Sequence, residues 1–210
     1  MLEASKVTFG YPAGRPLLSG WSAAVGDGEM VGITGPSGRG KSTLLYLLGL
    51  MLRPTAGEVL VDGTPTGALH DSARARMRAH LFGFVFQDSA LDATRTVLDN
   101  VTEAALYRGD DLCLARERGR ELLLRLGVAL PADRRPGQVS GGQAQRIALS
   151  RAVLHNPRVV LADEPTGNLD AGSADQVMGA LRAQAQNGAA VLVVTHDPRA
   201  VADCDRVIEL

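Results

Sequence analysis

The sequence has few cysteines and no cluster of basic residues, and these shortages exclude two kinds of protein. Cys113 and Cys204 are its only cysteines and lie far apart, which argues against a disulfide framework or a metal site with clustered ligands. We expect both to be packing residues. The formal net charge is -1 and no basic block is present. Because binding along a nucleic acid needs clustered cations, no nucleic-acid partner is expected.

A long hydrophobic run is also missing. The longest apolar stretch, residues 44–52, is about half of the ~20 residues that a membrane-spanning helix requires, so it predicts a buried helix. The first six residues include Glu3 and have no apolar core, unlike a secretory signal. We therefore expect a cytoplasmic protein. With 45% hydrophobic residues, the chain is long enough to form one α/β domain with a subdomain.

Lysine is nearly absent, since only Lys6 and Lys41 are lysines among 22 Lys and Arg residues. Lys41 lies in a glycine-rich segment that satisfies the Walker A pattern, Gly35-Pro36-Ser37-Gly38-Arg39-Gly40-Lys41-Ser42-Thr43. In this pattern loop amides and a helix N-terminus bind phosphates, while the serine hydroxyl binds Mg²⁺. The compact lysine ammonium fits between phosphate oxygens where a planar guanidinium would not. The segment therefore predicts a nucleotide site.

The rest of the chain predicts alternating strands and helices. Glycine, proline and Asp-Gly punctuation in residues 7–34 is typical of antiparallel hairpins, and residues 31–34 lead as a strand into the glycine-rich loop. Further strands are expected at 58–62, 81–86, 159–162 and 189–195, and helices at 41–52, 73–80, 116–126 and 174–186. The last two strands are continuously apolar, as in a buried parallel sheet. Arg74, Arg76 and Arg78 are expected on a solvated helix face.

Asp163 and Glu164 follow a predicted buried strand directly. In open α/β sheets ligands bind at the carboxyl ends of the strands. Asp163 would therefore hold Mg²⁺, and Glu164 would accept a proton from the attacking water. The alternative is that the two carboxylates only flank a turn at Pro165.

Ser140-Gly141-Gly142-Gln143 opens a long predicted helix. Ser140 and Gln143 have the spacing of a capping box, which needs no function beyond starting the helix. The two glycines would also let backbone amides approach a phosphate at the positive helix end. From the residues alone, both interpretations stay open.

Residues 139–143, placed ahead of Asp163 and Glu164, resemble the signature motif of ABC-type ATPases, and four further residues match landmarks of that family. The resemblance implies that Tyr11 stacks on adenine and that Gln87 links the γ-phosphate and Mg²⁺ to a membrane partner. It implies that Asp170 crosses a dimer and that His196 senses the γ-phosphate. Taken singly, such residues would be a packing tyrosine, a surface glutamine and a solvated histidine.

The resemblance implies an α/β P-loop NTPase with a RecA-like core, an N-terminal antiparallel β subdomain and a helical subdomain insertion. The core would comprise residues 1–87 and 157–210, and the helical subdomain about 88–156. Two copies would close head to tail around MgATP, and a membrane permease would dock near Gln87, which places the chain on the inner face of the membrane. The implied catalytic residues are Glu164, His196 and Gln87, and the metal site is Ser42, Gln87 and Asp163. The implied nucleotide-binding residues are Tyr11, Gly35, Ser37, Gly38, Gly40, Lys41, Ser42, Thr43, Ser140, Gly141, Gly142, Gln143 and Asp170.

Residues 163–170, together with 84–87, are similar to the branch that contains macrolide-export, lipoprotein-release and cell-division ATPases. Two features depart from the pattern: Val139 replaces the usual leucine, and residues 91–94 lack a Leu-Pro run. The resemblance implies an ATPase that energises a separate permease. The alternative is an ATP-gated regulatory ATPase that signals through a membrane protein without transport, as in cell division.

Overall fold

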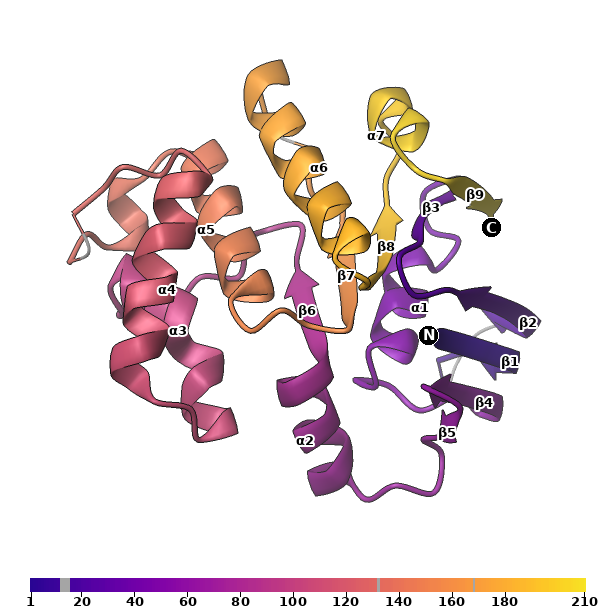
Figure 1. Cartoon of the computed structure of the whole chain (residues 1–210). Coiled ribbons are helices and arrows are strands. Elements are labelled where there is room, and N and C mark those ends of the chain that lie inside the picture. The colour runs from indigo at the N-terminus through magenta and orange to yellow at the C-terminus, as the bar shows by residue number, and fades with distance from the viewer. Residues whose placement is uncertain (12–15, 132, 168) are drawn as a thin grey trace.

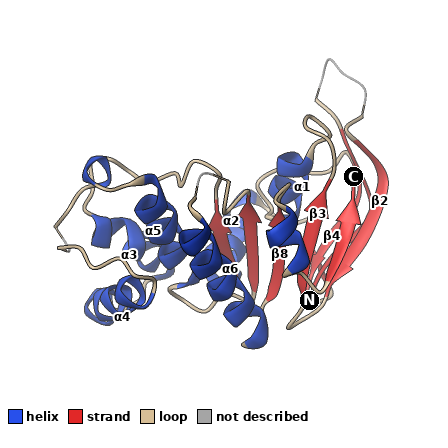
Figure 2. Ribbon diagram, turned by 90° about the horizontal axis from the view of Figure 1, so that it is seen from above, coloured by secondary structure: helices blue, strands red, loops and turns tan. Residues whose placement is uncertain are grey.

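The computed structural model describes residues 1–11, 16–131, 133–167 and 169–210, which form two sheets and their covering helices (Figures 1 and 2). The strands are β1 (Leu2–Phe9), β2 (Leu18–Val25), β3 (Met30–Thr34), β4 (Ala56–Val61), β5 (Thr64–Pro65), β6 (Phe82–Val85), β7 (Val159–Asp163), β8 (Ala190–Val194) and β9 (Arg206–Glu209). The helices are α1 (Lys41–Leu48), α2 (Asp71–Leu81), α3 (Val97–Arg108), α4 (Leu112–Arg125), the 3₁₀ turn η1 (Pro136–Gln138), α5 (Gly141–Val153), α6 (Ala171–Gln186) and α7 (Pro198–Ala202).

The larger sheet has the strand order β6-β7-β8-β3-β9, and each neighbouring pair is parallel. Every residue of β7 and β8 is buried, as their continuous apolar runs predict. β3 belongs to this sheet, so the expectation that the opening segment is antiparallel as far as Thr34 is wrong for its last strand. Alternation does not distinguish the two sheets here, because β3 is apolar throughout and only its partners decide its place.

The second sheet has the order β2-β1-β4-β5 and is antiparallel, which confirms the predicted N-terminal β layer. Helix α1 lies between the two sheets. Leu44, Leu45, Leu47 and Leu48 are buried there against strands of both. Burial of a leucine side chain contributes about 1.5–3 kcal/mol, so these leucines hold the helix firmly behind the glycine-rich loop.

The opposite face of the parallel sheet is covered by α5 and α6, whose apolar residues pack on β7 and β8. Helices α3 and α4 pack on the far side of α5 around a separate apolar cluster that includes Val101 and Ile147. In Figure 1 these three helices stand together, beyond β6 and away from the antiparallel sheet. Helix α5 thus contacts the sheet on one side and the helical layer on the other.

Helix α1 ends earlier than the sequence predicts. It stops at Leu48 with Gly49 as its C-cap, and Leu50 then takes a left-handed conformation, φ 58°. Buried Arg74 donates to the carbonyls of Leu50 and Leu52, at 3.3 and 2.6 Å, and Arg78 donates to Leu50 at 2.8 Å. The expectation that Arg74 lies on a solvated face is therefore wrong. Two arginines from α2 thus satisfy main-chain carbonyls of the segment that follows α1.

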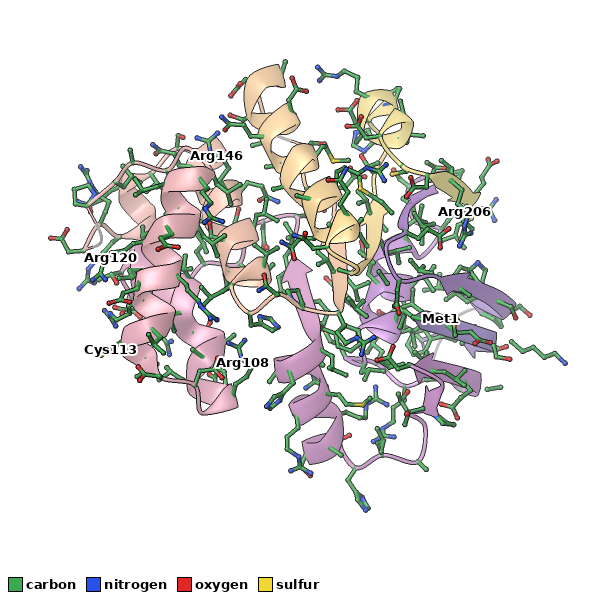
Figure 3. All side chains as sticks on the ribbon, viewed as in Figure 1. Met1, Arg108, Cys113, Arg120, Arg146 and Arg206 are labelled. Atoms are coloured by element: carbon green, nitrogen blue, oxygen red, sulfur yellow. The ribbon has the colours of Figure 1, made fainter. Side chains whose placement is uncertain are left out.

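Cys113 is exposed on the outer side of α4, contrary to its expected packing role (Figure 3). Its neighbour Asp111 caps that helix by accepting from the amides of Cys113 and Leu114. Cys204 is partly buried and packs beside α6 and β8. In the ranges that the structure describes, no helix has the length and apolarity needed to cross a membrane.

Candidate functional site

The carboxyl ends of four parallel strands deliver the candidate site residues to one edge of the sheet. β3 leads into the glycine-rich loop, β7 ends at Asp163 and Glu164, and β8 is followed by His196. β6 ends two residues before Gln87. Since parallel strands share one direction, side chains at their carboxyl ends are brought together whatever their separation in the sequence.

The glycine-rich loop turns through backbone conformations that favour glycine. Gly38 has φ 79°, and Gly40, the N-cap of α1, has φ 89°. A left-handed residue at the start of the helix leaves the first amides of α1 free to bind an anion, at the end where the helix dipole is positive. Lys41 Nζ donates to the carbonyls of Gly35 and Pro36, at 2.7 and 3.0 Å. The ammonium of Lys41 is thus held against the glycine-rich loop, where the phosphates are expected to bind.

A cavity of about 430 Å³ opens over this loop. Ten of the candidate residues line it: Ser37, Gly38, Gly40, Lys41, Ser42, Thr43, Gln87, Asp163, Glu164 and His196. Leu17 and Val194 complete the lining. The cavity therefore combines backbone amides, one ammonium, hydroxyls and two carboxylates, which is the set of groups that binds a nucleotide phosphate with a divalent cation.

Asp163 lies at the bottom of the site and is 5% exposed. Burial raises the pKa of its carboxyl, and a hydrogen bond with the Ser42 side chain opposes that shift. Glu164 and Lys41 act on Asp163 in opposite directions, the carboxylate raising and the ammonium lowering its pKa. A buried carboxylate beside a serine hydroxyl is a pair of oxygen ligands of the type that Mg²⁺ prefers.

Glu164 has two carboxylate oxygens with different surroundings. Oε1 lies 2.8 Å from Nδ1 of His196, whereas Oε2 is buried without a hydrogen-bond partner. The backbone of Glu164 is left-handed, φ 45°, a strained conformation that is concentrated at functional sites. The hydrogen bond to Glu164 raises the pKa of exposed His196 above its usual value of 6.5. Oε2 is therefore an acceptor whose hydrogen-bonding capacity is unused by the described protein groups.

Gln87 is exposed, and the turn after it is held by side chains of α5 that sequence reasoning missed. Gln145 donates from Nε2 to the Phe86 carbonyl at 3.3 Å and accepts from Ser89 Oγ at 2.7 Å. Arg151 donates to the carbonyls of Ser89 and Ala90, at 2.8 and 2.6 Å. The sequence offers one sign of this contact, the polar residue Gln145 on an otherwise apolar face of α5. The pattern does not indicate which residue Gln145 would bond.

Ser140 and Gln143 form the predicted capping box at the start of α5, so this structural interpretation is confirmed. Gln143 N donates to Ser140 Oγ at 3.2 Å and Ser140 N donates to Gln143 Oε1 at 2.9 Å. Gly141 lines a separate cavity together with Gln87 and Glu164. Ser140 is exposed and is absent from the described lining of the cavity over the glycine-rich loop. The helix start is thus stable by itself and faces solvent.

Two other predicted residues also lie away from the cavity over the loop. Asp170 caps α6 by accepting hydrogen bonds from the backbone N–H and the hydroxyl of Ser173, at 3.0 and 2.7 Å. The hydrogen bond from this N–H lowers the pKa of the Asp170 carboxyl. Arg146 of α5 donates to the same hydroxyl at 2.7 Å, which ties α5 to α6. Tyr11 is 52% exposed and packs edge to face on Phe9. Residues 12–15, which follow it, lie outside the described part of the chain.

A parallel sheet with a glycine-rich loop between β3 and α1, and a buried Asp163 beside Ser42 at the adjacent strand ends, defines a P-loop nucleotide triphosphatase. Within that class, residues 18–167 match the family model for the ABC transporter. The chain belongs to the ABC transporter family, as an ATP-binding and ATP-hydrolysing subunit.

Comparisons with individual proteins agree with this membership. The chain is 47% identical over 214 residues to the lipoprotein-releasing system ATP-binding protein LolD of Anaeromyxobacter dehalogenans, covering 100% of this chain and 90% of the relative. It is 43% identical to the macrolide export ATP-binding/permease protein MacB 1/2 of Paracoccus denitrificans, over 95% of this chain but 30% of that longer relative. A solved dimeric ATP-binding cassette in a post-hydrolysis state with ADP and Pi superposes with a TM-score of 0.92, at 35% identity, covering 100% of this chain and 94% of that one.

Proposed function

We propose that the chain hydrolyses MgATP as a head-to-tail dimer and that this cycle drives a membrane permease. The observation that carries the proposal is the division of the site. The cavity over the phosphate loop holds the groups that bind and hydrolyse the nucleotide, while Ser140, at the start of α5, is exposed and outside its described lining. A second copy facing the first would place its Ser140–Gly142 segment over the open cavity. The dimeric state of the solved relative supports this arrangement.

Ser42, Asp163 and Gln87 would hold Mg²⁺, and the side chains present fit that ion. Asp163 is buried beside the Ser42 side chain, and both line the cavity with Gln87. Carboxylate, hydroxyl and amide oxygens suit a cation that keeps several waters. When bound, Mg²⁺ neutralises charge on the phosphate oxygens.

Each remaining residue has a role that follows from its position. Lys41, the loop glycines and the first amides of α1 bind the phosphates, and Tyr11 stacks on the base. Glu164, whose side chain lines the cavity, takes the proton of the attacking water at its carboxylate. His196, 2.8 Å from Oε1, orients that carboxylate and senses the γ-phosphate. The second copy completes the site with two parts of its chain. One is the start of α5, Ser140, Gly141, Gly142 and Gln143, and the other is Asp170.

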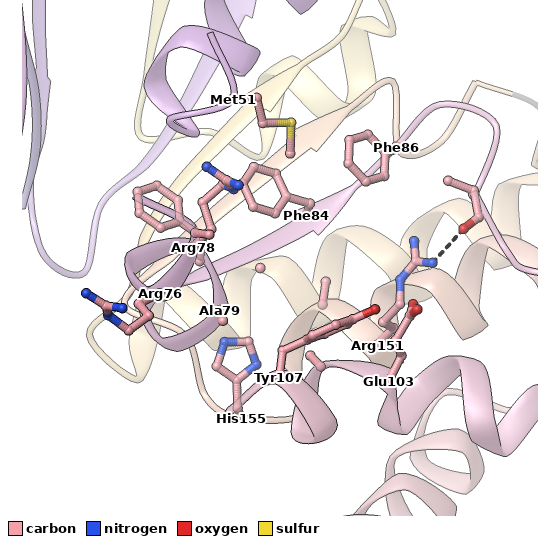
Figure 4. Close-up of a pocket in the computed structure, with 16 residues that line it drawn as sticks. Met51, Arg76, Arg78, Ala79, Phe84, Phe86, Glu103, Tyr107, Arg151 and His155 are labelled. Carbon is pink, nitrogen blue, oxygen red and sulfur yellow. Dashed lines mark hydrogen bonds between the residues drawn. The ribbon is translucent and has the colours of Figure 1, made fainter. Parts of the chain in front are cut away.

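The permease would dock in a groove between the sheet core and the helical subdomain, residues 88–156. This groove of about 610 Å³ runs between α2, β6, α3 and α5 (Figure 4). Phe84, Phe86 and Met51 give it an apolar wall, and Tyr107, 70% exposed, stands at its other side. Arg76 and Arg78 add positive charge along α2. The groove fits a short cytoplasmic helix that is apolar on one face and acidic on the other, and its occupancy would hold the chain at the inner face of the membrane.

The relatives point to the class of system. LolD is named for lipoprotein release and MacB for macrolide export, and MacB is named as an ATP-binding/permease protein. We infer that the present chain energises a permease of this branch. The second candidate, a regulatory ATPase without transport, is separated by measuring ATP-dependent substrate movement in vesicles that contain the membrane partner. ATP-dependent flux refutes the regulatory role.

Complementation between two inactive variants tests the composite site. Lys41→Ala lacks the phosphate-binding cation but keeps Ser140, and Ser140→Arg blocks the helix start but keeps the phosphate loop. Each variant alone should hydrolyse ATP slowly, whereas an equimolar mixture forms one intact site per mixed dimer and should recover activity. Near-wild-type turnover by Ser140→Arg alone, or no recovery from two folded variants, contradicts the proposal. Thermal denaturation of each variant provides the folding control.

A further inference from the structure

Residues 86–90 lie between the nucleotide site and the docking groove. Gln87 lines the cavity over the phosphate loop, while its neighbours Phe86 and Ala90 line the groove. Ser89 and Ala90 are both left-handed, with φ 62° and 45°. Two consecutive residues with side chains in this region are strained, so the turn persists only if surrounding groups hold it.

Helix α5 supplies those groups through two side chains about 1.7 turns apart. Gln145 bonds the Phe86 carbonyl and the Ser89 hydroxyl, and Arg151 bonds the carbonyls of Ser89 and Ala90. Gln145 is 5% exposed, so its polar atoms have few alternatives. Together they fix the main chain on both sides of Gln87 and its neighbour Asp88.

We propose that Gln145 and Arg151 form a clamp that positions Gln87. This proposal rests on the proposed role of Gln87 in hydrolysis. Arg151 is a positioning residue because it reaches the chemistry only through the backbone of residues 89 and 90.

Arg151 lines the groove and at the same time holds the turn at residues 89 and 90. Its guanidinium lines the groove near Glu103 while it bonds the turn, as Figure 4 shows. Burial lowers its pKa, which is the effect expected for a cation largely removed from water.

A double-mutant cycle in the full chain tests the clamp. Arg151→Met keeps the apolar stem and removes both hydrogen bonds, and Gln87→Ala removes the group that the clamp positions. Arg151→Met should lower kcat about tenfold or more, with little change in KM, since a displacement of about 1 Å can cost about a hundredfold. In the Gln87→Ala background the same change should have no further effect on kcat, because residues that act through one another are not additive.

Two further variants separate positioning from general stability. Arg151→Lys keeps the charge and one carbonyl bond and should recover part of the lost kcat. Ala90→Gly relieves the left-handed strain and should also recover part of the kcat of Arg151→Met. Arg74→Met is the matched control, since Arg74 is likewise a buried arginine on main-chain carbonyls but holds Leu50 and Leu52. It should lower thermal stability and leave kcat within about twofold.

The outcomes are distinct. If Gln87→Ala leaves kcat unchanged, the role of Gln87 fails, and the clamp proposal fails with it. If Gln87→Ala lowers kcat but Arg151→Met does not, or if Arg151→Met lowers it equally in both backgrounds, the clamp alone is wrong. Should Arg151→Met fail to fold, Arg151→Lys in both backgrounds gives the same comparison. Equal loss of kcat in Arg74→Met would show that stability, and not position, limits turnover.

Discussion

Replacement of Glu164 by glutamine isolates proton acceptance from every other property of this side chain. Glutamine has nearly the same size and shape, so it fills the same 12%-exposed position and keeps a polar atom within reach of His196. The change removes the negative charge and makes one terminal atom a donor. The side chain can then no longer accept a proton from water.

The size of the effect follows from that role. General-base catalysis contributes about 10²–10⁴-fold to a rate, so kcat should fall by about that factor, equivalent to about 3–5 kcal/mol in the activation free energy. Affinity for MgATP should change little, because Lys41, Ser42 and the loop amides are untouched. Since binding persists and hydrolysis does not, ATP should trap the closed dimer.

Three measurements on one preparation check this prediction. A phosphate-release assay gives kcat, size-exclusion chromatography with and without MgATP gives the dimer fraction, and thermal denaturation verifies the fold. Glu117→Gln is the matched control, because it removes one negative charge from an exposed position on α4, away from the catalytic cavity and from Arg151. Glu164→Gln with more than about a tenth of wild-type kcat would refute the assignment of Glu164 as the base.

Three other predictions follow from single features. Lys41→Ala should raise the dissociation constant of MgATP roughly ten- to hundredfold by calorimetry, since a hydrogen bond to a charged group contributes about 1.5–3 kcal/mol, and unchanged affinity would contradict the role of Lys41. Burial lowers the pKa of His155 from 6.5 to about 4. As the pH falls, His155 is therefore protonated in the unfolded chain before it is protonated in the folded one. Up to about 3 kcal/mol of the free energy of unfolding, present above pH 6.5, is lost as the pH falls toward 4. Urea titrations of His155→Leu should show a weaker dependence of stability on pH. Gly49→Ala places a methyl group 2.5 Å from the Phe84 ring and should destabilise the chain by about 1–3 kcal/mol, whereas Gly179→Ala, in open space on α6, should not.

The fold and most of the cavity could be predicted because their signals are local. Gly35 to Ser42 is a continuous segment between a strand and a helix, and Asp163 and Glu164 directly follow an apolar run. Strand direction then brings Gln87 and His196 to the same edge. Family resemblance was needed to single out Tyr11, Gln87, Asp170 and His196, which have no distinctive local pattern.

The errors arise where long-range partners outweigh local patterns. Helix α1 ends at Leu48 although the apolar run continues: Gly49 is its C-cap, Leu50 is left-handed, and Arg74 and Arg78 of α2 donate to the carbonyl of Leu50. The helical spacing of these arginines looked like a solvated face. Arg74 is buried because it contacts the loop after α1, more than twenty residues earlier, and the spacing of the arginines does not predict that contact.

The sequence by itself determined which family the motifs resemble, and it predicted which groups bind phosphate and which carboxylates serve the metal and the water. Those predictions depend on residue types at short fixed spacings, which can be recognised without the folded structure. Only the tertiary structure decided how Gln87 is held, since its supports come from Gln145 and Arg151, nearly sixty residues or more away. Hydrogen bonds between elements that are distant in the sequence form only when packing brings those elements together. They are therefore seen in the folded structure and cannot be inferred from the order of the residues.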